Sequence, residues 1–129
     1  MSHIKKEILA HMTGLELTES EELVAHFSFP EDFIGFQGHF PAKEVLPGVC
    51  QIQGILVMLE EWKKKKVGLK EIVQAKFLKP VSPCEKITCV CRNLKSVGKD
   101  VFLRASINGK ANKIAELKLK ISFKDEEFC

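Results

Sequence analysis

An apolar run from Pro47 to about Trp62 limits the folds open to this chain more than any other segment. Its apolar side chains fall on nearly every side of a helix rather than along one stripe. Such a helix has to be buried, yet the run is too short to span a bilayer. Pro47 suits the first helical turn, because its missing N–H would have no partner there. The sequence therefore predicts one long helix inside a protein core and no membrane insertion.

The segments around this helix alternate apolar and polar residues, which is the pattern of half-buried strands. The alternation is clearest at 23–29, 73–77, 101–107 and 117–123. Asn108-Gly109 separates the last two segments and is a strong hairpin signal. One long helix and several strands in 129 residues favour a single α+β domain, residues 1–129, in which a curved antiparallel sheet wraps around the helix.

Composition excludes several classes of function. The net charge is only +3 and the lysines are interleaved with acids, so nucleic acid is a poor candidate partner. Five cysteines without a zinc-type spacing favour reduced thiols over disulfides or a metal site, and Cys89 and Cys91 are expected on one face of a strand, in the core. The N-terminus lacks the pattern of a signal peptide, which favours a cytoplasmic protein. The basic block Lys63–Lys66 is either a solvated helix C-terminus or a docking patch for an acidic partner.

His39 is the strongest candidate for chemistry. Gly38 precedes it and Phe40-Pro41 follows it, so we expect the loop to hold its imidazole in one place. Imidazole titrates near neutral pH and suits a general base, although a loop histidine can also simply bond to backbone. The other three histidines lack this bracing and are predicted to be structural or exposed.

Two glutamines are out of place in the apolar helix. A buried amide costs about 1–3 kcal/mol unless it is hydrogen-bonded, so something polar must face Gln51 and Gln53. Two residues apart, they point about 200° from one another and cannot both serve one small site. Each either meets a backbone group or a subunit interface, or Gln53 faces a pocket shared with His39.

Several motifs together are similar to a known family. They are Phe36, GHFP at 38–41, LPGV at 46–49 and FLKPVSPCEKI at 77–87. This set closely resembles the 3-hydroxyacyl-acyl-carrier-protein dehydratases of the FabZ and FabA type, from about Leu23 to Phe123. Cys84 and Glu85 stand where the family has Gly and Asp. The resemblance implies the hotdog fold and a role in fatty-acid or related lipid biosynthesis.

The resemblance also implies roles for single residues. His39 would remove the proton next to the thioester carbonyl, and the backbone N–H groups of Gly48 and Val49 would bind the enolate oxygen. An acyl tunnel would be lined by Phe33, Phe36, Phe40, Cys50 and Ile52, each of which could equally be ordinary core. Cys50 as a nucleophile is less favoured than Cys50 as a packing residue. Where the family has a carboxylate to protonate the departing hydroxyl, this chain has Gln53, and an amide cannot deliver a proton.

Three outcomes follow from Gln53. The chain is a dehydratase that uses water or another group as its acid, an acyl-thioester-binding homologue without chemistry, or the partner subunit of a heterodimeric dehydratase. Thioester hydrolysis is a less favoured fourth. The expected partners are acyl carrier protein, whose phosphopantetheine holds the substrate, and a second chain in a homodimer, higher oligomer or heterodimer. No cofactor or metal of its own is expected.

Overall fold

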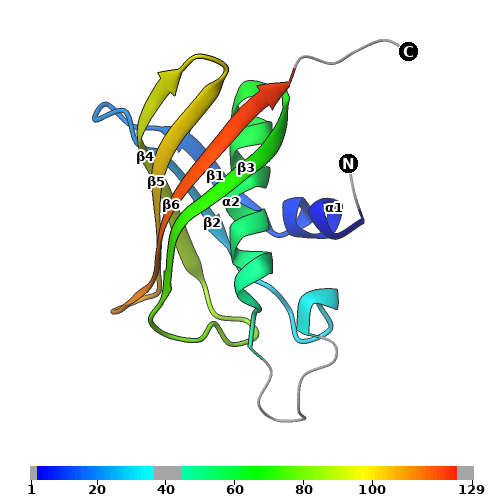
Figure 1. The fold of residues 1–129 in the computed structure, drawn as a ribbon. Helices are drawn as coiled ribbons and strands as arrows, with labels where there is room; N and C mark the ends of the chain where they lie inside the picture. Colours follow the sequence, from blue (N-terminus) through cyan, green and yellow to red (C-terminus); the bar gives the residue numbers. More distant parts are fainter. Residues whose placement is uncertain (1–2, 37–44, 125–129) are drawn as a thin grey trace.

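The computed structural model describes residues 3–36 and 45–124, which form one curved sheet with a long helix on its concave side (Figure 1). The elements in chain order are α1 (His3–Ala10), β1 (Met12–Leu17), β2 (Leu23–Phe27), η1 (Ile34–Phe36), α2 (Gly48–Lys63), β3 (Lys66–Phe77), β4 (Ile87–Val97), β5 (Asp100–Asn108) and β6 (Lys113–Lys124). The strand order is β1-β2-β4-β5-β6-β3, and all neighbouring strands are antiparallel. This is the α+β arrangement predicted from the sequence, with a sheet wrapped around a buried helix.

The core lies between α2 and the concave face of the sheet. Alternate strand residues point to opposite faces, so one set from each strand is buried against the helix. The buried set includes Leu23, Ala25, Phe27, Cys89, Cys91, Leu103, Ala105, Ile107, Leu117, Leu119 and Ile121. These positions confirm the predicted alternation in β2, β5 and β6. Burial raises the pKa of both core cysteines, that of Cys91 to about 12, so both stay protonated thiols as expected of packing residues.

The start of α2 and the N-terminal segment of the chain differ from the prediction. Pro47 precedes the first turn of α2 rather than lying in it, because its ψ of 149° is extended. The short helix α1 and strand β1 were not predicted. α1 covers the side of α2 that faces away from the sheet (Figure 1) and buries Ile8 completely. No helix of the described residues is long and apolar enough to cross a membrane.

β3 forms one edge of the sheet and exposes apolar side chains. Among the described residues it pairs only with β6. The strand is longer than predicted, and the expected half-burial of 73–77 is wrong, because Ile72, Val73 and Phe77 are 46%, 46% and 47% exposed. An edge strand offers unpaired backbone groups, and apolar side chains on it favour association with another chain. This edge fits the expectation that the chain works in an oligomer.

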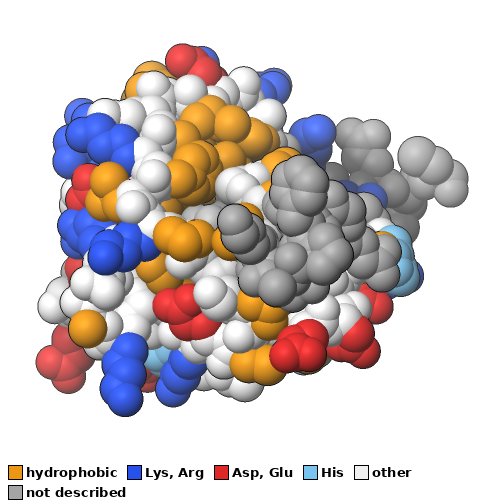
Figure 2. Space-filling model, turned by 90° about the horizontal axis from the view of Figure 1, so that it is seen from below, with side chains coloured by type: hydrophobic (Ala, Val, Ile, Leu, Met, Phe, Trp, Pro, Cys, Tyr) orange, Lys and Arg blue, Asp and Glu red, His pale blue; other side chains and the backbone are white. Residues whose placement is uncertain are grey.

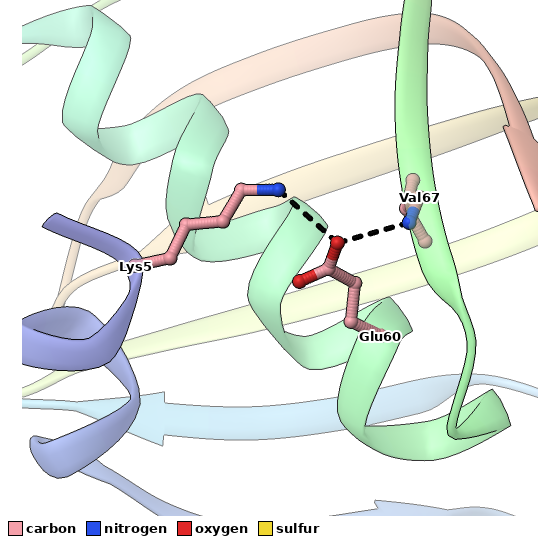
Figure 3. Close-up of polar contacts among 3 residues, drawn as sticks. All are labelled: Lys5, Glu60 and Val67. Atoms are coloured by element: carbon pink, nitrogen blue, oxygen red, sulfur yellow. Dashed lines mark hydrogen bonds and ion pairs between the residues drawn. The ribbon is translucent and has the colours of Figure 1, made fainter. Parts of the chain in front are cut away.

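The C-terminal end of α2 is closed by polar contacts. Glu60 Oε2 accepts hydrogen bonds from Lys5 Nζ of α1 at 3.1 Å and from Val67 N of β3 at 2.9 Å (Figure 3). The Lys64 backbone N–H donates to Glu60 O at 2.8 Å, with Lys64 in the left-handed conformation that ends the helix. One carboxylate thus joins α1, α2 and β3 at this end.

Candidate active site

The start of α2 presents backbone N–H groups without a cap. The N–H groups of Cys50 and Gln51 donate to Pro47 O at 3.0 and 3.1 Å, and no side chain caps the helix. Within the described residues, neither Gly48 nor Val49 donates its N–H to a backbone carbonyl outside the helix. Unpaired N–H groups and the partial positive charge of a helix start suit a developing oxyanion. The geometry therefore fits the role that the resemblance assigns to Gly48 and Val49.

Gly48 lies against the ring of Phe77, the last residue of β3. A Cβ atom at position 48 would lie 2.7 Å from Phe77 Cζ, so any larger residue would displace the ring from the helix start. Phe77 is 47% exposed and therefore stands beside the two free N–H groups rather than in the core. Sequence reasoning placed Phe77 on a strand but not at the site. Its place as the first residue of the family-like motif at 77–87 is the one signal that pointed to it.

The two glutamines each keep an amide oxygen without a partner. Gln51 Nε2 donates to Leu46 O at 3.2 Å, which fixes the chain just before the helix. Gln51 Oε1 and Gln53 Oε1 are buried and accept no hydrogen bond within the described residues. A buried acceptor without a donor costs about 1–3 kcal/mol. For Gln51 the prediction of a backbone partner is confirmed for the amide nitrogen, while Gln53 keeps an acceptor that a bound hydroxyl could satisfy.

Cys50 is a packing residue in this structure. It is 7% exposed, and a Cβ at Gly35 of η1 would lie 3.0 Å from its Sγ, so η1 packs directly on the thiol. Burial raises the pKa of Cys50, which disfavours the thiolate that a nucleophile needs. The packing interpretation is therefore the better of the two, and contact between Cys50 and an acyl chain stays a prediction.

The phenylalanines proposed for an acyl tunnel belong to a cluster of rings. The ring centroid of Phe33 lies 4.5 Å from that of Phe29 and 5.9 Å from that of Phe36. Phe33 and Phe36 are 2% and 3% exposed, and Ile52 is 6% exposed. In this chain they are core residues next to the start of α2, and their contact with substrate stays a prediction.

His39 and Phe40 lie outside the described residues, so their place in the site stays a prediction. The chain on both sides of them is fixed beside α2. Before them, Phe36 N donates to Phe33 O at 3.0 Å, within the turn that packs on Cys50. After them, Leu46 N donates to Val81 O at 2.8 Å. Both anchors lie close to the first turn of the helix.

The segment after β3 contains a further match to the family-like motif. Cys84, which stands where the family has glycine, has a φ of 65°, in the left-handed region that favours glycine. Its N–H donates to Phe29 O at 2.7 Å and ties the segment to the end of β2. Glu85 Oε1 accepts from the backbone N–H of Ser82 at 3.1 Å. The described residues contain no group of His, Cys, Asp and Glu side chains that could hold a metal ion.

Comparisons of sequence identify relatives over most of the chain. The ApeI dehydratase family, described as ApeI-like, matches residues 16–121. The 3-hydroxyacyl-acyl-carrier-protein dehydratase FabZ of Wolinella succinogenes is 32% identical, over 94% of this chain and 95% of that protein. FabZ of Enterococcus faecalis is also 32% identical, over 88% of this chain and 91% of that protein.

Comparisons of structure support the same fold. The dehydratase heterocomplex ApeI:P from Xenorhabdus doucetiae matches with a TM-score of 0.73 and 20% identity, over 86% of this chain and 96% of that one. A hypothetical thioesterase with coenzyme A from Streptococcus pneumoniae matches with a TM-score of 0.67 and 6% identity, over 97% of both chains. These structures share the hotdog fold with this protein. The match of the family model over residues 16–121 shows that the chain belongs to the ApeI-like dehydratase family.

Proposed function

We propose that this protein dehydrates 3-hydroxyacyl chains carried on acyl carrier protein to trans-2-enoyl chains. The observation that carries the proposal is the uncapped start of α2, where the N–H groups of Gly48 and Val49 are free beside Phe77. In this proposal the thioester carbonyl oxygen binds these N–H groups. Removal of a proton from C2 then turns that oxygen into an enolate oxygen, which the helix start stabilises.

The reaction requires one proton to be removed from C2 and one proton to be delivered to the departing hydroxyl. His39 removes the C2 proton, the C2–C3 double bond forms, and the C3–O bond breaks. The departing hydroxyl needs one proton to leave as water. Gln53 cannot supply it but can hold the hydroxyl, because its buried Oε1 accepts no hydrogen bond in the described residues. The imidazolium of His39 can return the proton it took, or a water molecule can deliver one.

A second candidate follows from the same glutamine. Without a positioned general acid, rates fall by about 10²–10⁴. The chain would then bind acyl thioesters and depend on a related subunit for the carboxylate. The exposed apolar residues of β3 favour a partner chain at this edge, either a second copy or a related chain.

In this proposal, acyl carrier protein binds at the end of the molecule where α2 begins. Figure 2 shows apolar side chains in the middle of this face, with Lys and Arg side chains along one of its sides. Val49 and Leu78 are 64% and 54% exposed, and Lys79 and Lys110 line a hollow between the segment after β3 and the β5–β6 hairpin. Surface cations of this kind speed the capture of an acidic protein.

Mass spectrometry of a 3-hydroxyacyl carrier protein tests the proposal by the loss of one water. Wild type is compared with His39→Ala and Gln53→Glu. Turnover by wild type that His39→Ala abolishes supports the dehydratase. Turnover that begins only with Gln53→Glu supports the partner-dependent candidate. If no variant turns over, even with the carrier protein bound, dehydration by this chain alone is wrong.

A further inference from the structure

A row of like charges crosses the convex face of the sheet, on the side away from α2. Arg92 of β4 is directly opposite Arg104 of β5, and Arg104 is directly opposite Lys118 of β6. The residue before each of them is buried in the core, so these three side chains project outward; these preceding residues are Cys91, Leu103 and Leu117. Directly opposite residues place their Cβ atoms about 4.5–5.5 Å apart, and like charges at that spacing destabilise a sheet. The row therefore weakens the sheet unless an anion neutralises it.

Within the described residues, no carboxylate makes a direct contact with the row. Arg92, Arg104 and Lys118 form no ion pair and no side-chain hydrogen bond among them. Glu116 lies in the same hollow as the row, and its carboxylate accepts a hydrogen bond from Lys113 at 2.6 Å. That bond, and then the charges of nearby cations, hold the pKa of Glu116 below its usual range. Arg92 is one of those cations, but Glu116 divides its charge among Lys113, Lys76 and Arg92 and therefore offsets only part of the charge of the row.

Lys120 is a cation on the same face that does have an acidic partner. It lies two residues beyond Lys118 on the same strand and face, and its Nζ is 3.6 Å from Asp100 Oδ2. Within the described residues, none of the three cations of the row has a direct ion pair of this kind. This difference between neighbouring cations indicates that the row is arranged for a ligand from outside the chain.

The row lines a small hollow. Its volume is about 200 Å³, and the rest of its lining consists of Gln74, Lys76, Ala105, Glu116 and Leu117. Pockets for whole cofactors or drug-sized ligands measure about 300–1,000 Å³. An arginine fork binds two phosphate oxygens at once, whereas a lysine acts as a point charge. Gln74 is directly opposite Lys118 and adds an uncharged N–H donor.

We propose that this row of Arg92, Arg104 and Lys118 is a binding site for the phosphate or diphosphate group of a small phosphorylated ligand. It shares no residue with the start of α2 and lies on the other face of the sheet, so it does not depend on the proposed dehydratase activity. The bound anion neutralises three adjacent cations and thereby stabilises β4, β5 and β6.

Calorimetric titration with pyrophosphate at constant ionic strength tests the site in wild type, Arg104→Gln and the matched control Lys120→Gln. We expect saturable binding to wild type and to Lys120→Gln. For Arg104→Gln we expect a dissociation constant about tenfold higher or more, since a charge-assisted fork is lost. ADP distinguishes esterified phosphate from the free ion, and we expect it to bind within about threefold of pyrophosphate if only the phosphates are recognised.

Thermal unfolding in chloride gives a second, independent measurement. Arg104→Gln removes one of the opposed charges, so without pyrophosphate it should unfold at a higher temperature than wild type. Pyrophosphate should raise the midpoint of wild type and leave that of Arg104→Gln unchanged. Equal rises in all three proteins, or no saturable binding to wild type, would overturn the site. So would an Arg104→Gln midpoint in chloride below that of wild type.

Discussion

The two ends of α2 are built in opposite ways. At the C-terminal end, Glu60 bonds to Lys5 and to the backbone of Val67, and Lys64 closes the last turn. At the N-terminal end no side chain caps the helix, and the amide oxygen of Gln53 is buried without a donor in the described residues. One helix thus has an end whose polar groups are satisfied internally and an end where some backbone N–H groups and amide oxygens have no partner among the described residues.

The polar contacts that stabilise the fold and the polar groups available for catalysis therefore lie at opposite ends of α2. Free N–H groups and unpaired acceptors weaken a fold, and natural proteins keep them where binding or catalysis uses them. The contacts at the other end join α1, α2 and β3 and offset that loss. Changes at the start of α2 should therefore alter catalysis more than stability, and changes at its end should do the reverse.

Removing one N–H at the helix start tests the first half of this comparison and has the largest expected effect. Gly48→Pro deletes the N–H at a position where helices tolerate proline. We expect turnover to fall by about 10²–10³, the usual loss for one oxyanion donor. Gly48→Ala is the matched control, because it brings the same Cβ against Phe77 but keeps the N–H.

Initial rates on a 3-hydroxyacyl carrier protein compare the turnover of the two variants, and urea unfolding compares their stability. Gly48→Pro should be much slower than Gly48→Ala and similar to it in stability. If the two variants turn over at the same rate, the Gly48 N–H takes no part in the chemistry. The close contact with Phe77 would then be the reason that residue 48 is a glycine.

The sequence predicted the fold better than it predicted the site. α2 and the alternating strands were predictable because burial imposes a period on their residues. α1 buries only Ile8 and β3 buries only Val67, so burial imposes no period on either element. The contact of Gly48 with Phe77 joins a helix start to a distant strand end, which only the packed chain reveals. The unpaired oxygen of Gln53 is likewise a property of its surroundings, although the glutamine itself was recognisable as out of place.

Removing the Glu60 carboxylate tests the second half of the comparison. Its side chain is 10% exposed, so its contacts are little screened by solvent. Glu60→Ala leaves the Val67 N–H without its acceptor and should lower the free energy of unfolding by about 2 kcal/mol. Glu60→Gln keeps an oxygen for Val67 and loses only the charge, so about 1 kcal/mol is expected. Urea unfolding measures both values.

Turnover by the Glu60 variants, measured below their unfolding transitions, should match wild type within about twofold, since about 0.4 kcal/mol of barrier or less would be involved. A loss of turnover as large as that of Gly48→Pro would show that the two ends are coupled through the helix. The separation of stability from function would then fail.

The smallest expected effect concerns the backbone of Lys64, which has a φ of 55° and a ψ of 38°. This left-handed conformation costs a non-glycine residue about 1 kcal/mol, and glycine avoids that cost. Lys64→Gly also loses the exposed contact with Glu61 and gains freedom in the unfolded chain, so we expect a net gain of only about 0.5 kcal/mol. Lys64→Ala loses the same contact but keeps the backbone cost. In paired urea unfolding the glycine variant should therefore exceed the alanine variant by about 1 kcal/mol. If the two variants are equally stable, the last turn stores no strain, and the C-terminal end of α2 is as relaxed in its backbone as it is in its polar contacts.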